Sequence, residues 1–150
     1  MLSEQRQSIF IDIISEATEM VFTHVDRNDL TGVVDYASIY AQSPEEFSEI
    51  ATELQQNGSV AIERPSGNYY MLNEPLETPA GAIHYCRVRV FDTDHPERGY
   101  ADFEVTNYSA FKEKYSSKPY FSVLNSDKEM IELRDPAYNV RAYFPSGSFS

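Results

Sequence analysis

The sequence predicts an α+β protein in which two βαβββ modules follow an N-terminal amphipathic helix. Apolar residues recur at helical spacing between residues 3 and 22. Two later stretches, residues 33–91 and 100–144, each divide into a strand, a helix and three further strands. Several of these strands alternate polar and apolar residues, as expected when one face of a sheet packs against helices. We therefore expect a helical extension over residues 1–32 and one domain, built from the two modules, over residues 33–150.

The N-terminal helix begins at a typical capping residue. Ser3 can accept a hydrogen bond from the first turn, and Glu4 is favourable there because of the helix dipole. Seven apolar residues share one helical face: Ile9, Phe10, Ile13, Ile14, Ala17, Met20 and Val21. This stripe has to be buried either on the domain or on a second subunit, so a homodimer is one expectation.

The first module opens with a strand over residues 33–41, because β-branched and aromatic residues are frequent in it. Alternation would place three polar or aromatic side chains on one face: Tyr36, Ser38 and Tyr40. It would place the remaining side chains on the opposite face: Val33, Asp35, Ala37, Ile39 and Ala41.

The next helix has the strongest local signals in the chain. Ser43, Pro44 and Glu46 provide an N-cap, an N1 proline and a capping-box glutamate, and Gly58 ends the helix. Its apolar stripe is Phe47, Ile50, Ala51 and Leu54.

A hairpin, a loop and a long strand complete the first module. Residues 59–63 and 69–73 form the hairpin, and a loop containing Pro75 and Pro79 follows. The strand over residues 81–91 has a polar face of Tyr85, Arg87 and Arg89. Its other face carries His84, Cys86, Val88 and Val90. We expect the histidine and the cysteine on this apolar face to be buried in the core rather than to chelate a metal.

The second module repeats this order. The strand over residues 100–105 has an apolar face of Ala101, Phe103 and Val105 and a polar face of Tyr100, Asp102 and Glu104. Asn107 can cap a short helix whose inner stripe is Tyr108, Phe111 and Tyr115. Strands over residues 121–124, 129–134 and 140–144 follow, with a turn over residues 125–128 and a frayed tail from Pro145. The sequence leaves open which face of the last strand carries Arg141 and Tyr143.

Composition excludes several classes of function. The formal net charge is −12, from 24 acidic and 12 basic side chains, so direct nucleic-acid binding is not expected. No apolar run is long enough to span a membrane, and the N-terminus lacks the features of a signal peptide. The single cysteine excludes an internal disulfide. We therefore expect a cytoplasmic protein with no membrane partner.

The order of the elements resembles the vicinal oxygen chelate superfamily, which includes glyoxalases, ring-cleaving dioxygenases and bleomycin-resistance proteins. Three segments carry the resemblance: residues 35–47, with the opening strand and helix; residues 101–105, with the helix after them; and the turn Asp135-Pro136-Ala137-Tyr138-Asn139 before the last strand. The resemblance implies a glyoxalase-like curved mixed sheet in the form of a cup, with helices beneath it and a cavity on its other face. The polar strand faces would line this cavity: Tyr36, Ser38, Tyr40, Tyr85, Arg87, Arg89, Tyr100, Asp102, Glu104 and Glu132, with Arg141 and Tyr143 as additional candidates.

Metal enzymes of this superfamily use histidine or glutamate ligands from the first and last strands of their modules. The matching positions here are Tyr36, Tyr100 and approximately Ala142, none of which is a good ligand for a divalent metal. We therefore expect a divergent member without the usual metal site. No nucleotide-binding glycine motif is present, so we expect no cofactor.

The charged residues of the expected cavity allow two interpretations. Arg87 and Arg89 could pair with Asp102 and Glu104 across neighbouring strands and only hold the wall together. Alternatively, the arginines could bind a carboxylate or phosphate while the tyrosines stack on a ring.

The leading functional hypothesis is a non-catalytic protein that binds a small molecule or a partner in such a cavity. Bleomycin-resistance proteins, which are acidic dimers that sequester a cationic drug, are the parallel that the resemblance offers. One alternative is a divergent enzyme that uses a metal held by Asp102, Glu104 and Glu132, or Tyr100 as a general acid. Another is an acidic interaction protein that imitates DNA towards a basic partner.

Overall fold

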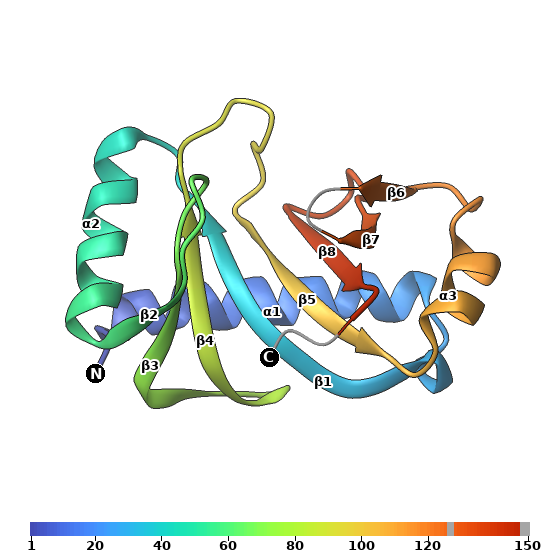
Figure 1. Ribbon diagram of the computed structural model, residues 1–150, viewed down its shortest axis with the longest axis horizontal. Helices are drawn as coiled ribbons and strands as arrows, with labels where there is room; N and C mark the ends of the chain where they lie inside the picture. Colours follow the sequence, from blue (N-terminus) through green and yellow to red (C-terminus); the bar gives the residue numbers. More distant parts are fainter. Residues whose placement is uncertain (126–127, 148–150) are drawn as a thin grey trace.

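The computed structural model describes residues 1–125 and 128–147 as one eight-stranded mixed sheet with three α-helices. In chain order the elements are α1 (Glu4–His24), the 3-10 helix η1 (Arg27–Asp29), β1 (Leu30–Tyr40), α2 (Pro44–Gln56), β2 (Gly58–Ile62), β3 (Tyr69–Thr78), β4 (Gly81–Arg89), β5 (Gly99–Val105), α3 (Tyr108–Tyr115), β6 (Phe121–Asn125), β7 (Glu129–Leu133) and β8 (Val140–Pro145). The strand order is β2-β3-β4-β1-β5-β8-β7-β6. Figure 1 shows α2 and α3 at opposite ends of the molecule.

The strand pairing confirms the predicted duplication. Within each module the first strand pairs in parallel with the last, β1 with β4 and β5 with β8. The modules join where β1 and β5 pair antiparallel at the centre of the sheet. The predicted fold class, two βαβββ modules in a curved mixed sheet preceded by a helix, is therefore confirmed.

The N-terminal helix lies along the sheet and crosses both modules, as Figure 1 shows for α1. The Ser3 side chain caps it by accepting a hydrogen bond from the backbone of Arg6, as predicted. Six of the seven predicted stripe residues are fully buried, and Ile9 is partly buried against them. Because its own chain covers this stripe, the stripe gives no reason to expect a second subunit. The homodimer stays a prediction.

The alternation predicted for the first strand fails at its beginning. Strand β1 starts at Leu30, and between Val34 and Ala37 it advances three residues while β5 advances two, from Phe103 to Ala101. Such a bulge reverses the faces of the residues before it. Val34 is therefore in the core, whereas Val33 is 47% exposed, contrary to the prediction. From Tyr36 to Tyr40 the predicted faces are correct.

A second irregularity changes the β3–β4 hairpin. The expected loop around Pro75 is instead part of β3, which reaches Thr78 with a register shift between Met71 and Leu76. At this end of β4, Ile83 is buried and His84 is exposed. The predicted burial of His84 is therefore wrong, whereas that of Cys86 is confirmed.

The second module follows the prediction closely. Asn107 caps α3, whose Phe111 and Tyr115 are buried. On β8, Arg141 and Tyr143 lie on the cavity face, whereas Ala142 is in the core on the opposite face. Pro145 belongs to β8 rather than to a tail. The predicted turn and the predicted frayed end fall partly on residues 126–127 and 148–150, which lie outside the described residues.

Within the described parts of the chain, no helix is both long enough and apolar enough to cross a bilayer.

Gly99 is required where α1 crosses the pairing of β1 with β5. A Cβ atom at this position would lie 2.1 Å from the Ser38 carbonyl oxygen and 2.7 Å from the Ile13 Cδ1 atom. Because the neighbouring backbone cannot move away without breaking the sheet, we expect Gly99→Ala to lower the free energy of unfolding by about 2 kcal/mol or more. The matched control is Gly147→Ala, since a Cβ there meets no atom within 4 Å. Urea unfolding followed by circular dichroism measures both, and equal midpoints would contradict this account.

Candidate functional site

A cavity of ≈ 470 Å³ opens on the face of the sheet that carries the tyrosines. The loops after β2 and β4 and strands from both modules contribute to its wall: Tyr36, Arg64, Ser66, Tyr69, Arg87, Arg89, His95, Tyr100, Asp102, Leu124, Met130, Glu132, Arg141 and Tyr143. Tyr36, Tyr40, Tyr100 and Tyr143 form a buried aromatic cluster at its base. Rings of this cluster contact one another edge to face, as between Tyr36 and Tyr100 or between Tyr100 and Tyr143.

The structure brings most of the sequence-predicted residues together in this wall. Eight of them line it: Tyr36, Arg87, Arg89, Tyr100, Asp102, Glu132, Arg141 and Tyr143. Tyr40 is 1% exposed and lies in the cluster beneath, and Tyr85 packs against the same cluster. Glu104 does not line the cavity; it lies on a separate groove beside α1 and the start of β1.

Sequence reasoning missed six cavity residues, three of which lie in a turn or a loop. Arg64 and Ser66 lie in the β2–β3 turn, and His95 lies in the loop between β4 and β5. The other three, Tyr69, Leu124 and Met130, lie on strands β3, β6 and β7, whose cavity faces the sequence analysis did not assign. A turn has no side-chain period, so its composition gives no signal of which residues point into a cavity.

Arg87 is a buried cation whose hydrogen-bond acceptors are all uncharged. It donates to the Gly67 carbonyl oxygen at 3.0 Å, the Tyr100 hydroxyl at 2.9 Å and the Ser66 hydroxyl at 2.7 Å. The residue is only 4% exposed, and it forms no ion pair within residues 1–125 and 128–147. The predicted pairing with Asp102 and Glu104 is wrong, because β1 lies between β4 and β5 in the sheet.

Arg141 occupies the corresponding position in the second module. Ser38 pairs with Arg87 on one side and with Tyr100 on the other, and Tyr100 pairs with Arg141. Arg141 is also buried, but it contacts Glu97 Oε1 at 2.9 Å and Glu132 Oε2 at 3.1 Å. Arg141 therefore has carboxylate counter-ions from its own chain, whereas Arg87 has none among the described residues.

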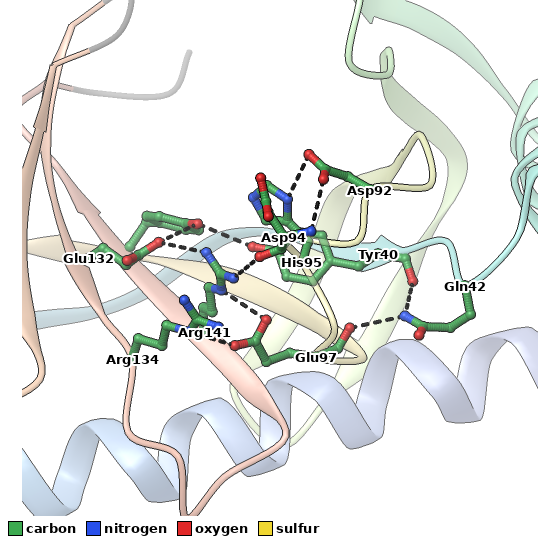
Figure 2. Close-up of polar contacts among 10 residues, drawn as sticks. Tyr40, Gln42, Asp92, Asp94, His95, Glu97, Glu132, Arg134 and Arg141 are labelled. Carbon is green, nitrogen blue, oxygen red and sulfur yellow. Dashed lines mark hydrogen bonds and ion pairs between the residues drawn. The ribbon is translucent and has the colours of Figure 1, made fainter.

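The Arg141 network also holds the loop between β4 and β5 (Figure 2). Arg141 donates to the Asp94 carbonyl oxygen at 2.6 Å, and Arg134 contacts the second oxygen of Glu97 at 2.8 Å. Although burial raises the pKa of Glu97, the two arginines and a backbone hydrogen bond hold it below its usual range. Glu97 is therefore a stable internal anion.

His95 and Arg89 lie at the mouth of the cavity beside this loop. The His95 ring packs on Tyr40 with centroids 4.9 Å apart, and its Nδ1 lies 3.2 Å from Asp92 Oδ2. Burial, Arg89 and Arg141 lower the His95 pKa, so the ring is neutral at pH 7. Arg89 lies with its guanidinium 6.0 Å from the centre of the Tyr40 ring. The guanidinium itself forms no ion pair or hydrogen bond with any residue that the structure describes.

Asp102 is 5% exposed, and its carboxyl Oδ1 has no hydrogen-bond partner among the described residues. Burial, followed by the nearby Asp35, raises its pKa to about 8. Burial and Glu104 likewise raise the pKa of Asp35 to about 6. At pH 7 Asp102 is therefore mostly protonated, and Glu132 is paired with Arg141, so neither carboxyl group balances the charges of Arg87 and Arg89 in the cavity wall. The cavity is locally positive although the chain has a net charge of −12.

The residues present do not fit the metal site that the sequence resemblance implies. Tyr36 and Tyr100 lie in the cavity, but the adjacent cavity-facing position of the last strand is Arg141, since Ala142 is on the other face. An arginine cannot ligate a cation. Across residues 1–125 and 128–147, no three His, Cys, Asp or Glu side chains are grouped so that they could hold a metal ion.

A second hollow, of ≈ 640 Å³, lies between α1 and the beginning of β1. Its wall is largely apolar and includes Phe22, Val33 and Pro79, with Arg27 and Glu104 as its charged residues. The tyrosine-lined cavity combines buried charge, hydroxyl groups and a carboxyl group with a raised pKa, which is typical of a functional site.

Comparisons with known proteins support the fold. No protein-family model and no curated protein matches the chain. A solved structure described as "Structural Genomics, Protein EC4020" aligns with a TM-score of 0.64 at 14% identity, over 99% of this chain and 93% of that chain. A glyoxalase/bleomycin resistance protein/dioxygenase superfamily member from Vibrio splendidus 12B01 aligns with a TM-score of 0.47 at 8% identity, over 75% of this chain and 97% of that chain. The first likeness shows a shared fold over almost the whole chain and shows nothing about function. The second is too weak to add to the argument.

Asp102 should make stability depend on pH. Its pKa is higher in the folded state than its ordinary value of 3.8, so its stabilising contribution is complete below about pH 4 and is lost as the pH rises through about 8. Each unit of this difference corresponds to about 1.4 kcal/mol. We expect Asp102→Asn to gain stability relative to the unsubstituted protein between pH 5 and pH 9, by a few kcal/mol. Urea unfolding at pH 5, 7 and 9 measures this change, with the exposed Asp12→Asn as the control. Parallel pH profiles for all three proteins would show that Asp102 is ionised at pH 7.

Proposed function

We propose that this protein binds a small organic anion in the tyrosine-lined cavity, with Arg87 as the central contact. The observation that carries the proposal is the burial of Arg87 without any anionic partner among the described residues. Arginine is almost never fully buried unless it is paired with an anion, because removing its charge from water is costly. A carboxylate or phosphate group from a ligand would provide the missing charge.

The equivalent position in the second module supports this proposal. Arg141 is buried to the same extent, and two carboxylates of the same chain neutralise it. The fold can therefore supply counter-ions to an arginine at this position, and it does so in only one of the two modules. Nη1 and Nη2 of Arg87 each carry a second N–H besides those bonded to Tyr100 and Ser66, and these are the donors for an external anion.

The surrounding side chains suit a flat organic ligand. Arg89 offers a second cation without a hydrogen bond or ion pair to the described residues, and planar guanidinium groups bind carboxylate or phosphate oxygens in pairs. The Tyr69 and Tyr36 rings provide aromatic surface in the same wall. Leu124 and Met130 add apolar surface from the second module.

The proposal develops the hypothesis of a non-catalytic binding protein and changes the expected charge of its ligand. A cationic ligand, as in the bleomycin-resistance parallel, would meet the unbalanced charges of Arg87 and Arg89, since Glu132 is already paired with Arg141. The metal-dependent alternative required Asp102, Glu104 and Glu132 to lie together. Glu104 lines the groove beside α1 instead of the cavity that contains Asp102 and Glu132, which argues against this alternative. The acidic interaction protein stays a prediction, for which salt-sensitive capture of a basic partner would be the test.

Titration calorimetry with benzoate and phenyl phosphate tests the anion site, with benzylamine as the cationic control. We expect at least one of the two anions to bind, and Arg87→Met to weaken it about 10- to 100-fold, because a hydrogen bond to a charged group contributes about 1.5–3 kcal/mol. Arg89→Gln should weaken it less. Arg27→Gln removes the same charge outside the cavity and should leave the Kd unchanged. Binding of benzylamine alone, or unchanged anion binding by Arg87→Met, would overturn the proposal.

Unliganded stability should distinguish the two equivalent arginines. Arg141→Met leaves Glu97 and Glu132 without their shared buried cation, and we expect a loss of about 3–5 kcal/mol. Arg87→Met removes a cation with uncharged partners only, so the loss should be below about 2 kcal/mol. Urea unfolding of both variants without ligand measures the difference, and a larger loss for Arg87→Met would indicate that an internal anion already balances Arg87.

A further inference from the structure

We propose that the ligand of this cavity carries two separate anionic groups, as a dicarboxylate does, with one group bound by Arg87 and the other by Arg89. The inference rests on the proposed anion site and narrows its ligand from a small organic anion to one with two negative charges. It makes Arg89 the residue that distinguishes ligands with two anionic groups from ligands with one.

The charges around Arg141 balance within the chain, as Figure 2 shows for this network. Arg134 and Arg141 both contact Glu97. Arg141 also contacts Glu132. Two cations therefore share two carboxylates, and the network as a whole is neutral. An external anion has to be bound by cations from the other side of the cavity.

Three arginines of the first module line the cavity: Arg64, Arg87 and Arg89. Arg64 lies on the exposed turn between β2 and β3, where it donates to the Glu63 carbonyl oxygen and where water screens its charge. Arg87 and Arg89 both extend from β4 into the cavity, and neither forms an ion pair with any residue that the structure describes. Charge complementarity therefore favours a ligand with two negative charges on this side of the cavity.

The acids near this side already have other partners or lie on other strands. Asp92, in the loop after β4, contacts His95 Nδ1 at 3.2 Å and accepts a hydrogen bond from the Asp94 backbone at 2.9 Å. Asp102 lies on β5, which β1 separates from β4, and it forms no ion pair with any described residue. The two charges on β4 are therefore left for a ligand.

The two guanidinium groups occupy separate positions on the cavity wall. Arg87 lies over the Tyr69 ring, with its Cζ atom 4.4 Å from the ring centre. Arg89 lies beside the Tyr40 ring instead, with its Cζ atom 6.0 Å from the centre. Residues two apart on a strand are separated by about 7 Å, which is more than the span of the oxygens in one carboxylate or phosphate group. A group bound by both terminal nitrogens of Arg87 therefore leaves Arg89 for a second group of the same ligand.

The rest of the wall suits a rigid ring between the two anionic groups. Tyr36 and Tyr69 offer aromatic surface, and Leu124 and Met130 offer apolar surface from the second module. A benzene ring with two carboxylates in the meta or para arrangement holds the charges apart without flexible bonds. Such a molecule is small enough for a cavity of ≈ 470 Å³.

Calorimetry at pH 7 with isophthalate and terephthalate, each compared with its monomethyl ester, tests the inference. The ester has a similar shape and one charge fewer, so it separates the effect of charge from that of size. We expect at least one dicarboxylate to bind 10-fold or more tightly than its ester. Equal affinities within both pairs, or phenyl phosphate binding more tightly than either dicarboxylate, would overturn the inference while leaving the anion site intact. Failure of benzoate, phenyl phosphate and both dicarboxylates to bind would overturn the inference and the proposed function together.

Substitutions of Arg89 assign the preference for the dicarboxylate. Arg89→Gln should reduce the ratio of the two affinities to about 1, whereas Arg89→Lys keeps the charge and should retain a preference. Arg87→Met should weaken both members of each pair, and Arg27→Gln should change neither. Because the Arg89 guanidinium has no hydrogen bond to the described residues, its variants should unfold at the same urea concentration as the unsubstituted protein. A preference that survives in Arg89→Gln would show that another cation, such as Arg64, binds the second group and would overturn the assignment to Arg89.

Discussion

The antiparallel pairing of β1 with β5 is the constraint on which the rest of the structure depends. It joins the two modules at the centre of the sheet and leaves β4 and β8 on either side, each parallel to its neighbour. One face of these strands is buried by α1, which leaves no room for a side chain at Gly99. None of the described helices contributes a residue to the other face, whose tyrosines and arginines surround the cavity instead.

Duplication places an arginine at the same position of both modules, and the two have different surroundings. In the second module the loop before β5 supplies Glu97 and the strand β7 supplies Glu132, so Arg141 is a structural cation. In the first module the turn after β2 supplies only the Gly67 carbonyl oxygen and the Ser66 hydroxyl to Arg87. The same backbone pairing thus gives two sites: the charge of Arg141 is neutralised by carboxylates of the chain, and the charge of Arg87 is not. The second is the one suited to an external ligand.

Local sequence patterns predicted the elements and most of the cavity-facing residues, and they failed where the backbone departs from regular alternation. The cap at Ser43 and the alternation around Arg87 were sufficient for α2 and for most of β4. The bulge after Val34 and the shifted β3–β4 register exchanged the faces of neighbouring residues, because an odd number of extra residues, one in β1 and three in β3, reverses a period of two. The expected pairing of Arg87 with Asp102 failed for another reason. Strand order is set by long-range pairing, which no local pattern contains.

Net charge is a poor guide to the ligand of this protein, because burial decides which acids are ionised near the cavity. The 24 acidic side chains give a strongly negative chain, and that value alone favours a cationic ligand. In the cavity wall that Arg87 shares, however, the burial of Asp102 next to Asp35 keeps this acid protonated at pH 7. A neutral Asp102 leaves the Arg87 charge unbalanced, which favours an anionic ligand. Ionisation of this one buried carboxyl group should therefore weaken anion binding as the pH rises through about 8.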